Sequence, residues 1–192
     1  MSRLDEALKR FDEINSEDPR IDTVDGEQWP RELLYGRRMS AMLEQFAPDA
    51  PEPIRLAARA QHLGRWAIPR DDYPEGRAGY HRWRTDLGRY HARLAAEVLA
   101  ELGYEEEVRD RVATLLQKKG LQNDPDVQLL ENVICLVFLK YYLEDFAGKH
   151  PRDKVIRILQ RTWKKMSPEG QDAALKLEMP EPVASLVREA LG

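Results

Sequence analysis

Apolar side chains recur three or four residues apart along almost the whole chain, and this spacing constrains the fold more than any other feature. The most regular stripe ends at Gly103 and consists of Tyr80, Trp83, Leu87, His91, Leu94, Val98 and Leu102. Such a period places the side chains on one face of a helix. No stretch alternates between apolar and polar residues around a hairpin turn, as paired β-strands would. The sequence therefore predicts an all-α fold, a compact bundle of about eight helices.

The composition suits one globular core. The chain has 192 residues, of which 42% are hydrophobic and 33% are charged, so we expect a single helical domain over residues 1–192. The most central helix is expected over 125–146, because it is apolar nearly all round and follows Asp124-Pro125, an N-cap and a first-turn proline. Helices within residues 150–192 are expected to pack on this core.

The apolar segments are too short for a membrane protein. The longest uninterrupted run is Val133–Leu139, whereas a membrane-spanning helix needs roughly 20 residues. Residues 2–6 contain no apolar signal region. We therefore expect a cytoplasmic protein without membrane association. The single cysteine, Cys135, lies in the apolar run and is expected to be a buried core residue rather than a nucleophile.

Residues 59–93 combine positive charge with aromatic rings and imidazoles. This segment has eight arginines and four acidic residues, a local balance of +4 in a chain of net charge −4, and it holds three of the four histidines. Guanidinium groups bind phosphate and carboxylate with two parallel hydrogen bonds, so the segment predicts a pocket for an anion. The expected ligand-binding residues are His62, Arg65, Arg70, Arg77, His81, Arg84, His91, Lys118 and Lys119.

The helical pattern also predicts how this pocket is built. If the helix that ends near Trp66 packs against the helix over 80–102, His62 and His91 face each other. The irregular loop over 67–79 would then bring Arg70 and Arg77 over the opening. A purely structural alternative stays open, in which the arginines cap helix ends or pair with nearby acidic residues, and His91 is a hydrogen-bonded core residue.

From Tyr35 onward, the order of features resembles the HD domains, metal-dependent phosphohydrolases named for a histidine–aspartate doublet. The segments that carry the resemblance are Leu34–Met39, Ala57–Leu63, His91–Ala96 with Gly103-Tyr104, and Leu130–Val133. It covers about 33–146 and implies an HD-like helical core, with the last helices outside it.

The chain departs from this resemblance at the metal site. Tyr35, Leu63 and Asn132 stand where three of the four metal ligands are expected, and only His62 is kept. Apolar and amide side chains do not replace imidazole and carboxylate ligands. We therefore expect a degenerate HD-like scaffold that holds no metal and no other cofactor.

Five further motifs resemble an uncharacterised family, domain of unknown function 4202, over nearly the whole chain. They are the segments 61–70, 79–84, 124–128, 135–139 and 162–166. This resemblance implies membership of the family and carries no activity with it.

Three functions remain open from the sequence. The first is a metal-free binder of a phosphate-bearing ligand, such as a phosphorylated small molecule, a nucleotide or an RNA end. The second is a phosphohydrolase in which His62 or His91 acts as general acid or base and the arginines stabilise the phosphate. The third is a structural protein-interaction module.

A second basic segment, residues 149–165, suggests RNA as a possible partner. It has seven lysines and arginines and one acidic residue, with Lys154, Arg157 and Arg161 on one helical face. A basic helix can follow a phosphate backbone. Residues 1–27, with nine acidic residues against four basic ones, offer an internal alternative that neutralises this face. The oligomeric state is not indicated by the sequence.

Overall fold

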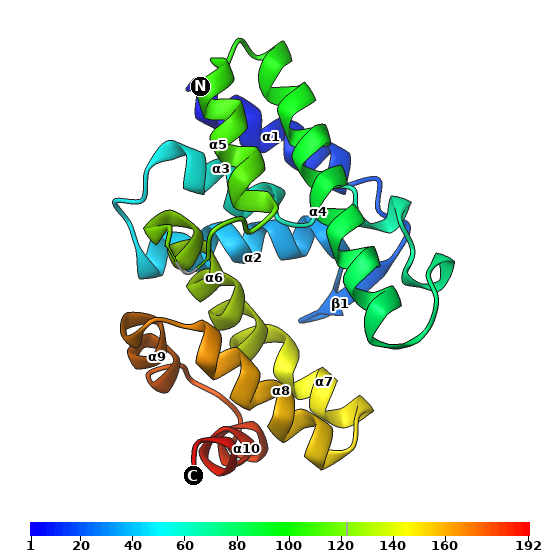
Figure 1. The fold of residues 1–192 in the computed structure, drawn as a ribbon, viewed down its shortest axis with the longest axis vertical. Helices are drawn as coiled ribbons and strands as arrows, with labels where there is room; N and C mark the ends of the chain where they lie inside the picture. The colour runs from blue at the N-terminus through cyan, green and yellow to red at the C-terminus, as the bar shows by residue number, and fades with distance from the viewer. Residues whose placement is uncertain (122) are drawn as a thin grey trace. The chain divides into compact units, whose positions relative to one another are not determined.

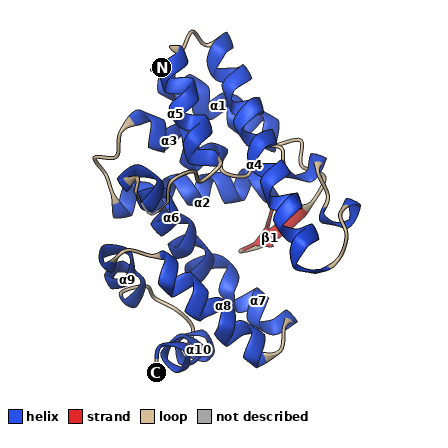
Figure 2. Cartoon of the chain, in the orientation of Figure 1, coloured by secondary structure: helices blue, strands red, loops and turns tan. Residues whose placement is uncertain are grey.

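The computed structural model describes residues 1–121 and 123–192, and it is helical almost throughout (Figure 2). The described residues form ten α-helices and a single two-stranded sheet, which confirms the all-α prediction with more helices than the expected number. The chain divides into two compact units, residues 1–120 and 121–192. The division falls inside the segment 33–146, and a single domain over residues 1–192 stays a prediction.

The N-terminal unit contains five helices, a hairpin and two short 3₁₀ turns. In chain order these are α1 (Arg3–Asn15), β1 (Ile21–Val24), β2 (Glu27–Pro30), α2 (Arg31–Phe46), α3 (Glu52–Ala60), η1 (Arg65–Ala67), η2 (Arg70–Asp72), α4 (Gly76–Glu101) and α5 (Glu106–Leu116). Helices α4 and α5 lie side by side (Figure 1). Four residues of the predicted stripe on α4 are buried, namely Trp83, Leu87, His91 and Val98. Tyr80, near the start of the helix, is exposed.

The hairpin corrects the expectation that the chain contains no strand. Strands β1 and β2 pair antiparallel, with Val24 opposite Glu27, and the turn residues Asp25 and Gly26 have φ values of 52° and 82°. Asp-Gly is a strong signal for a two-residue turn in which both φ angles are positive. The strands escaped prediction because each has only four residues and neither has a buried face that would impose apolar alternation.

The loop before α4 is tied to that helix by several hydrogen bonds. The indole Nε1 of Trp83 donates to the carbonyl oxygen of Ile68 at 2.9 Å, and the Tyr73 hydroxyl donates to Asp86 at 2.9 Å. Gly79 packs so closely on the loop that a Cβ atom there would lie 1.8 Å from the carbonyl oxygen of Pro74. The loop thus has a fixed path over the first turns of α4.

The C-terminal unit is made of helices only, as far as the structure describes it. They are α6 (Pro125–Val137), η3 (Phe138–Tyr142), α7 (Leu143–Lys149), α8 (Arg152–Lys165), α9 (Pro168–Leu175) and α10 (Glu181–Leu191). The Asp124 carboxylate accepts from the backbone N–H groups of residues 126 and 127, which confirms the predicted N-cap. Cys135 is buried, as expected.

The predicted helix over 125–146 is interrupted. Its middle segment, Phe138–Tyr142, is a π-helical turn, which the apolar run gives no means of predicting. Before this turn, the buried Asn132 donates to Ser167 Oγ, and its Oδ1 accepts from the backbone N–H of Ser167.

Among the described residues, no helix combines the length and hydropathy needed to cross a membrane.

Candidate functional site

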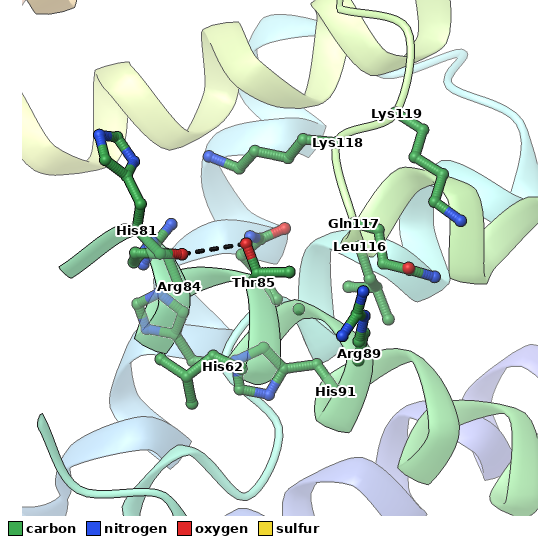
Figure 3. A pocket seen from close by; sticks show the side chains of 13 residues that line it. His62, His81, Arg84, Thr85, Arg89, His91, Leu116, Gln117, Lys118 and Lys119 are labelled. Atoms are coloured by element: carbon green, nitrogen blue, oxygen red, sulfur yellow. Dashed lines mark hydrogen bonds between the residues drawn. The ribbon is translucent and has the colours of Figure 1, made fainter. Parts of the chain in front are cut away.

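A cavity of about 380 Å³ lies within the N-terminal unit, between the turn after α3, the middle of α4 and the end of α5 (Figure 3). We call its more buried side the floor, which consists of Gln61, His62, Leu87, His91 and Leu116. We call its more exposed side the rim, which includes His81, Arg84, Thr85, Arg89, Lys118 and Lys119. All of these residues belong to one compact unit, so the unit holds the whole cavity.

The rim is positively charged. It carries Arg84, Arg89, Lys118 and Lys119, and no aspartate or glutamate is among the described residues that line the cavity. Arg89 lies 3.7 Å from the Asp86 carboxylate. Arg84 is half-buried and has no ion pair within the described part of the chain. The cavity therefore offers a guanidinium that pairs with no carboxylate among the described residues.

His91 is a fixed hydrogen-bond acceptor on the floor. Its side chain is 3% exposed, and Nδ1 lies 2.7 Å from the Leu63 carbonyl oxygen. A carbonyl only accepts hydrogen bonds, so Nδ1 carries the proton. Burial lowers the pKa of His91 to about 4, and the positive charges of Arg65 and Arg84 also lower it. At neutral pH the ring is uncharged and Nε2 is an acceptor.

Both ring nitrogens of His62 are already engaged. Arg65 Nη1 donates to Nε2 at 2.9 Å, and Nδ1 donates to the Glu32 carboxylate at 2.9 Å. Tyr35 stacks on the ring with a centroid distance of 3.8 Å, and the His91 ring is 6.2 Å away. Burial, followed by the charge of Arg65, holds the pKa of His62 well below its usual range. His62 is thus a neutral ring with a fixed orientation.

Glu32, which sequence reasoning did not single out, is the buried partner of His62. It is 3% exposed and accepts from Arg20 Nη2 at 2.8 Å, with Arg65 Nε 3.9 Å away. The fully buried carboxylate of Asp18 accepts from Arg20 and from the Glu32 backbone N–H. Burial raises the pKa of Glu32 to about 7, although the charges of Arg65 and Arg20 oppose the rise.

We call these residues the Glu32 network, which consists of Asp18, Arg20, Glu32, His62 and Arg65. Two carboxylates face two guanidiniums, so the network balances its own charge when Glu32 is ionised. Its members come from distant parts of the chain, and no local spacing indicates that they meet. The hairpin brings part of it together, because the Arg31 backbone N–H donates to the Arg20 carbonyl oxygen at its open end.

The structure brings six of the nine predicted ligand-binding residues to the cavity. These are His62, His81, Arg84, His91, Lys118 and Lys119. Lys118 extends towards the side where Arg84 and His81 lie, whereas Lys119 points away from them (Figure 3). Sequence reasoning did not single out Gln61, Thr85, Arg89 or Gln117, which also line it. Thr85 and Arg89 lie one turn apart on α4, the signal that could have suggested them.

The other three predicted residues do not line the cavity. Arg65 binds His62, and its guanidinium lies 4.9 Å from the centre of the Trp83 ring. Arg70 donates to the Tyr73 carbonyl oxygen at 2.9 Å, and Arg77 Nε donates to His81 Nε2 at 3.3 Å. The loop arginines therefore find partners close by in the chain and do not cover the opening as expected.

The remaining predicted positions are those of the degenerate metal site and of the basic segment over 149–165. Within residues 1–121 and 123–192, no three His, Cys, Asp or Glu side chains are arranged to hold a metal ion. Leu63 is fully buried, and Tyr35 stacks on His62. On α8, Lys154, Arg157 and Arg161 are exposed, and RNA binding there stays a prediction.

The family model described as Domain of unknown function (DUF4202) matches residues 5–187. The chain therefore belongs to this family, as its motifs predicted. No curated protein and no solved structure matches it. The likeness to HD domains stays a resemblance of sequence features.

The lowered pKa of His91 predicts a pH dependence of stability. The unfolded histidine takes up its proton near pH 6.5 and the folded one near pH 4, so the unfolded state binds more protons between these values. The free energy of unfolding should therefore increase by up to about 3 kcal/mol as the pH rises from 4 to 6.5, and decrease by the same amount as the pH falls.

Urea denaturation between pH 4 and 7.5, on the wild type and His91→Gln, measures this effect. The Gln amide keeps a donor for the Leu63 carbonyl oxygen but does not titrate. Subtracting the two curves removes the contribution of every other titrating group. If the stability of the two proteins changed with pH in the same way, the lowered pKa of His91 would not be the cause.

Proposed function

We propose that this protein binds a phosphate-bearing small molecule in the cavity, without a metal ion and with Arg84 as the main charged contact. One observation carries the proposal. Arg84 is half-buried on the wall of a cavity of about 380 Å³ and has no ion pair in the described part of the chain. Cavities of a few hundred Å³ are typical of small-molecule sites.

The charge around Arg84 supports an anionic ligand. Three more cationic side chains lie on the rim, and no acidic side chain among the described residues lines the cavity. The positive charge of Arg84 also contributes to the lowered pKa values of His62 and His91. A bound phosphate would compensate this charge and accept charge-assisted hydrogen bonds.

The protonation states favour binding over hydrolysis. His62 and His91 are neutral at pH 7, because their pKa values are lowered, so neither histidine supplies a proton as a general acid. Arg65 donates to Nε2 of His62, which removes this nitrogen as a base. Of the two floor histidines, only His91 keeps a ring nitrogen, Nε2, with no partner among the described residues to accept a proton from a ligand.

Replacing Arg84 with alanine should weaken phosphate binding. One charged hydrogen-bonded contact contributes about 1.5–3 kcal/mol, which corresponds to a rise in Kd of roughly 10- to 150-fold. Isothermal titration with inorganic phosphate, AMP, ribose 5-phosphate and glucose 6-phosphate measures it. The control is Arg93→Ala, an exposed arginine of the same helix that pairs with Glu97. It should change Kd less than about twofold.

Several results would contradict the proposal. Equal losses for Arg84→Ala and Arg93→Ala would show a general charge effect, and a wild type that binds none of the probes would favour the protein-interaction module. Binding that disappears with EDTA would exclude a metal-free site. Release of inorganic phosphate from a probe, lost in His91→Gln, would favour the phosphohydrolase.

A further inference from the structure

Helix α8 (Figure 1) presents three cations that the C-terminal unit does not neutralise. Arg157, Arg161 and Lys164 are exposed, and none of them has an ion pair in the described part of the chain. The other lysines and arginines of the unit have partners: the ion pairs are Lys149–Asp145, Arg152–Glu189, Lys165–Glu131, Lys176–Asp172 and Arg188–Glu181, and Lys140 and Lys154 contact Tyr141 and His150. The unpaired positive charge of this unit is thus gathered on one helix.

We call Arg157, Arg161 and Lys164 the α8 face, because they share one side of the helix. With about 100° between successive residues, the three lie within about 60° of one another. The side chains that point in the opposite direction, Val155 and Leu159 among them, are buried. At about 1.5 Å per residue, the α8 face extends over about 10 Å. The acidic Asp153 lies in the first turn of α8, before this stretch begins.

The acidic segment over residues 1–27 has partners of its own. Asp12 pairs with Arg37 and Arg59. Asp18 and Asp22 also pair with arginines of the N-terminal unit. The alternative in which this segment neutralises α8 therefore loses its main support, and the charge of the α8 face is left for a partner outside the chain.

The arrangement of the α8 face favours a nucleic-acid duplex over other polyanions. Each strand of a duplex carries one phosphate per about 3.4 Å of the helix axis, so about 10 Å of it presents about three phosphates to three cations. A helix that binds a membrane surface inserts its apolar side, but the apolar side of α8 is buried. Proteins that bind single strands stack the bases on aromatic rings. Trp163 of α8 is half-buried and lies more than about 100° from the α8 face.

We infer that the α8 face binds the phosphate backbone of double-stranded nucleic acid without regard to base sequence. Each of the three side chains would donate charge-assisted hydrogen bonds to phosphate oxygens. Contacts of this kind position a protein on a duplex and carry no sequence information. This binding is separate from the proposed function, because no residue of the α8 face lines the cavity.

Fluorescence anisotropy with labelled duplexes of about 20 base pairs tests the inference on the full chain. Three phosphate contacts predict that the Kd for duplex DNA rises roughly 40-fold when NaCl is raised from about 50 to about 200 mM. Duplex RNA of the same sequence should bind within about tenfold of DNA, since the phosphates are shared. The single strand should bind more weakly than either duplex.

The triple variant Arg157→Gln, Arg161→Gln and Lys164→Gln removes the charge of the α8 face. Its Kd for duplex DNA should be at least about tenfold higher than that of the wild type at about 50 mM NaCl, and the slope of log Kd against log salt should decrease by about 2.7. The double variant Arg157→Lys and Arg161→Lys keeps the charge, so its Kd should stay within about threefold of the wild type.

The matched control removes three paired cations of the same unit, through Lys149→Gln, Lys176→Gln and Arg188→Gln. It changes the net charge by the same amount and should raise Kd less than about threefold. Circular dichroism checks that each variant keeps the helical content of the wild type.

Four results would overturn the inference. The first is that neither duplex binds at about 50 mM NaCl. The second is equal weakening by the two triple variants, which would show a dependence on net charge alone. The third is a single strand that binds as tightly as the duplex. The fourth is competition by phosphatidylserine vesicles or by polyglutamate that equals competition by unlabelled duplex at the same concentration of charge, which would favour a membrane or an acidic protein.

Discussion

Replacing Glu32 with alanine should lower the free energy of unfolding by about 3–5 kcal/mol, because it breaks a buried ion network by removing one partner. The carboxylate accepts from Arg20 and His62, and Arg65 lies close by. Without the Glu32 carboxylate, Arg65 remains charged although its side chain is only 19% exposed. It has no other ion pair among the described residues. Chemical denaturation at pH 7.5, followed by circular dichroism, measures the loss.

Two variants make this prediction specific. Glu32→Gln keeps an acceptor oxygen and should cost less than alanine. Its cost should be larger at pH 5 than at pH 8, because a carboxyl group with a raised pKa stabilises the fold below pH 4.5 and this contribution is lost as the pH rises to about 7. Glu13→Ala, which removes an exposed partner of Lys9 and Arg10, should change stability by less than about 1 kcal/mol. Similar losses for Glu13→Ala and Glu32→Ala would contradict the role of the network.

Replacing Gly79 with alanine should destabilise the protein by at least about 3 kcal/mol, the upper part of the range for overpacked sites. The new Cβ would lie 1.8 Å from the Pro74 carbonyl oxygen, and a backbone atom tied into a short loop has little freedom to move. Thermal denaturation should show a clear decrease in melting temperature.

The control lies on the same helix. A Cβ at Gly88 would meet its nearest neighbours at 3.7 Å, an ordinary contact. Gly88→Ala should therefore raise stability by up to about 1 kcal/mol, because alanine favours the helix interior. If both substitutions lower the melting temperature equally, the close approach of Gly79 to Pro74 is not the cause.

Local signals predicted most of the helices. The stripe on α4 and the N-cap at Asp124 depend on residues within a few positions of one another, and both are found in the structure. The hairpin was missed because its short, exposed strands have no buried face, although Asp25-Gly26 carried the signal. The periodicity of apolar residues indicates which side of a helix or strand is buried. It does not predict the secondary structure of a segment that has no buried side.

The site was only partly predictable for a different reason. Charge clustering identified Arg84 and the histidines, because like charges near one another are visible in the sequence. The Glu32 network brings Glu32 close to His62 and Arg65, which follow it by 30 and 33 positions, and it results from tertiary packing. Gln61 was missed because its place on the floor of the cavity depends on how α3, α4 and α5 pack, which no local spacing indicates.

The π-helical turn at Phe138–Tyr142 has a consequence for the phase of the helices around it. A π turn takes up about one residue more than an α turn, so it rotates everything that follows by about 100° around the helix axis. The residues of α7 that contact α8 and α10 therefore do not follow the apolar spacing of α6. The turn thus sets which residues of α7 face inward. Removing one residue from it would leave the helical content almost unchanged, but it would rotate the fully buried Leu143 away from its present direction.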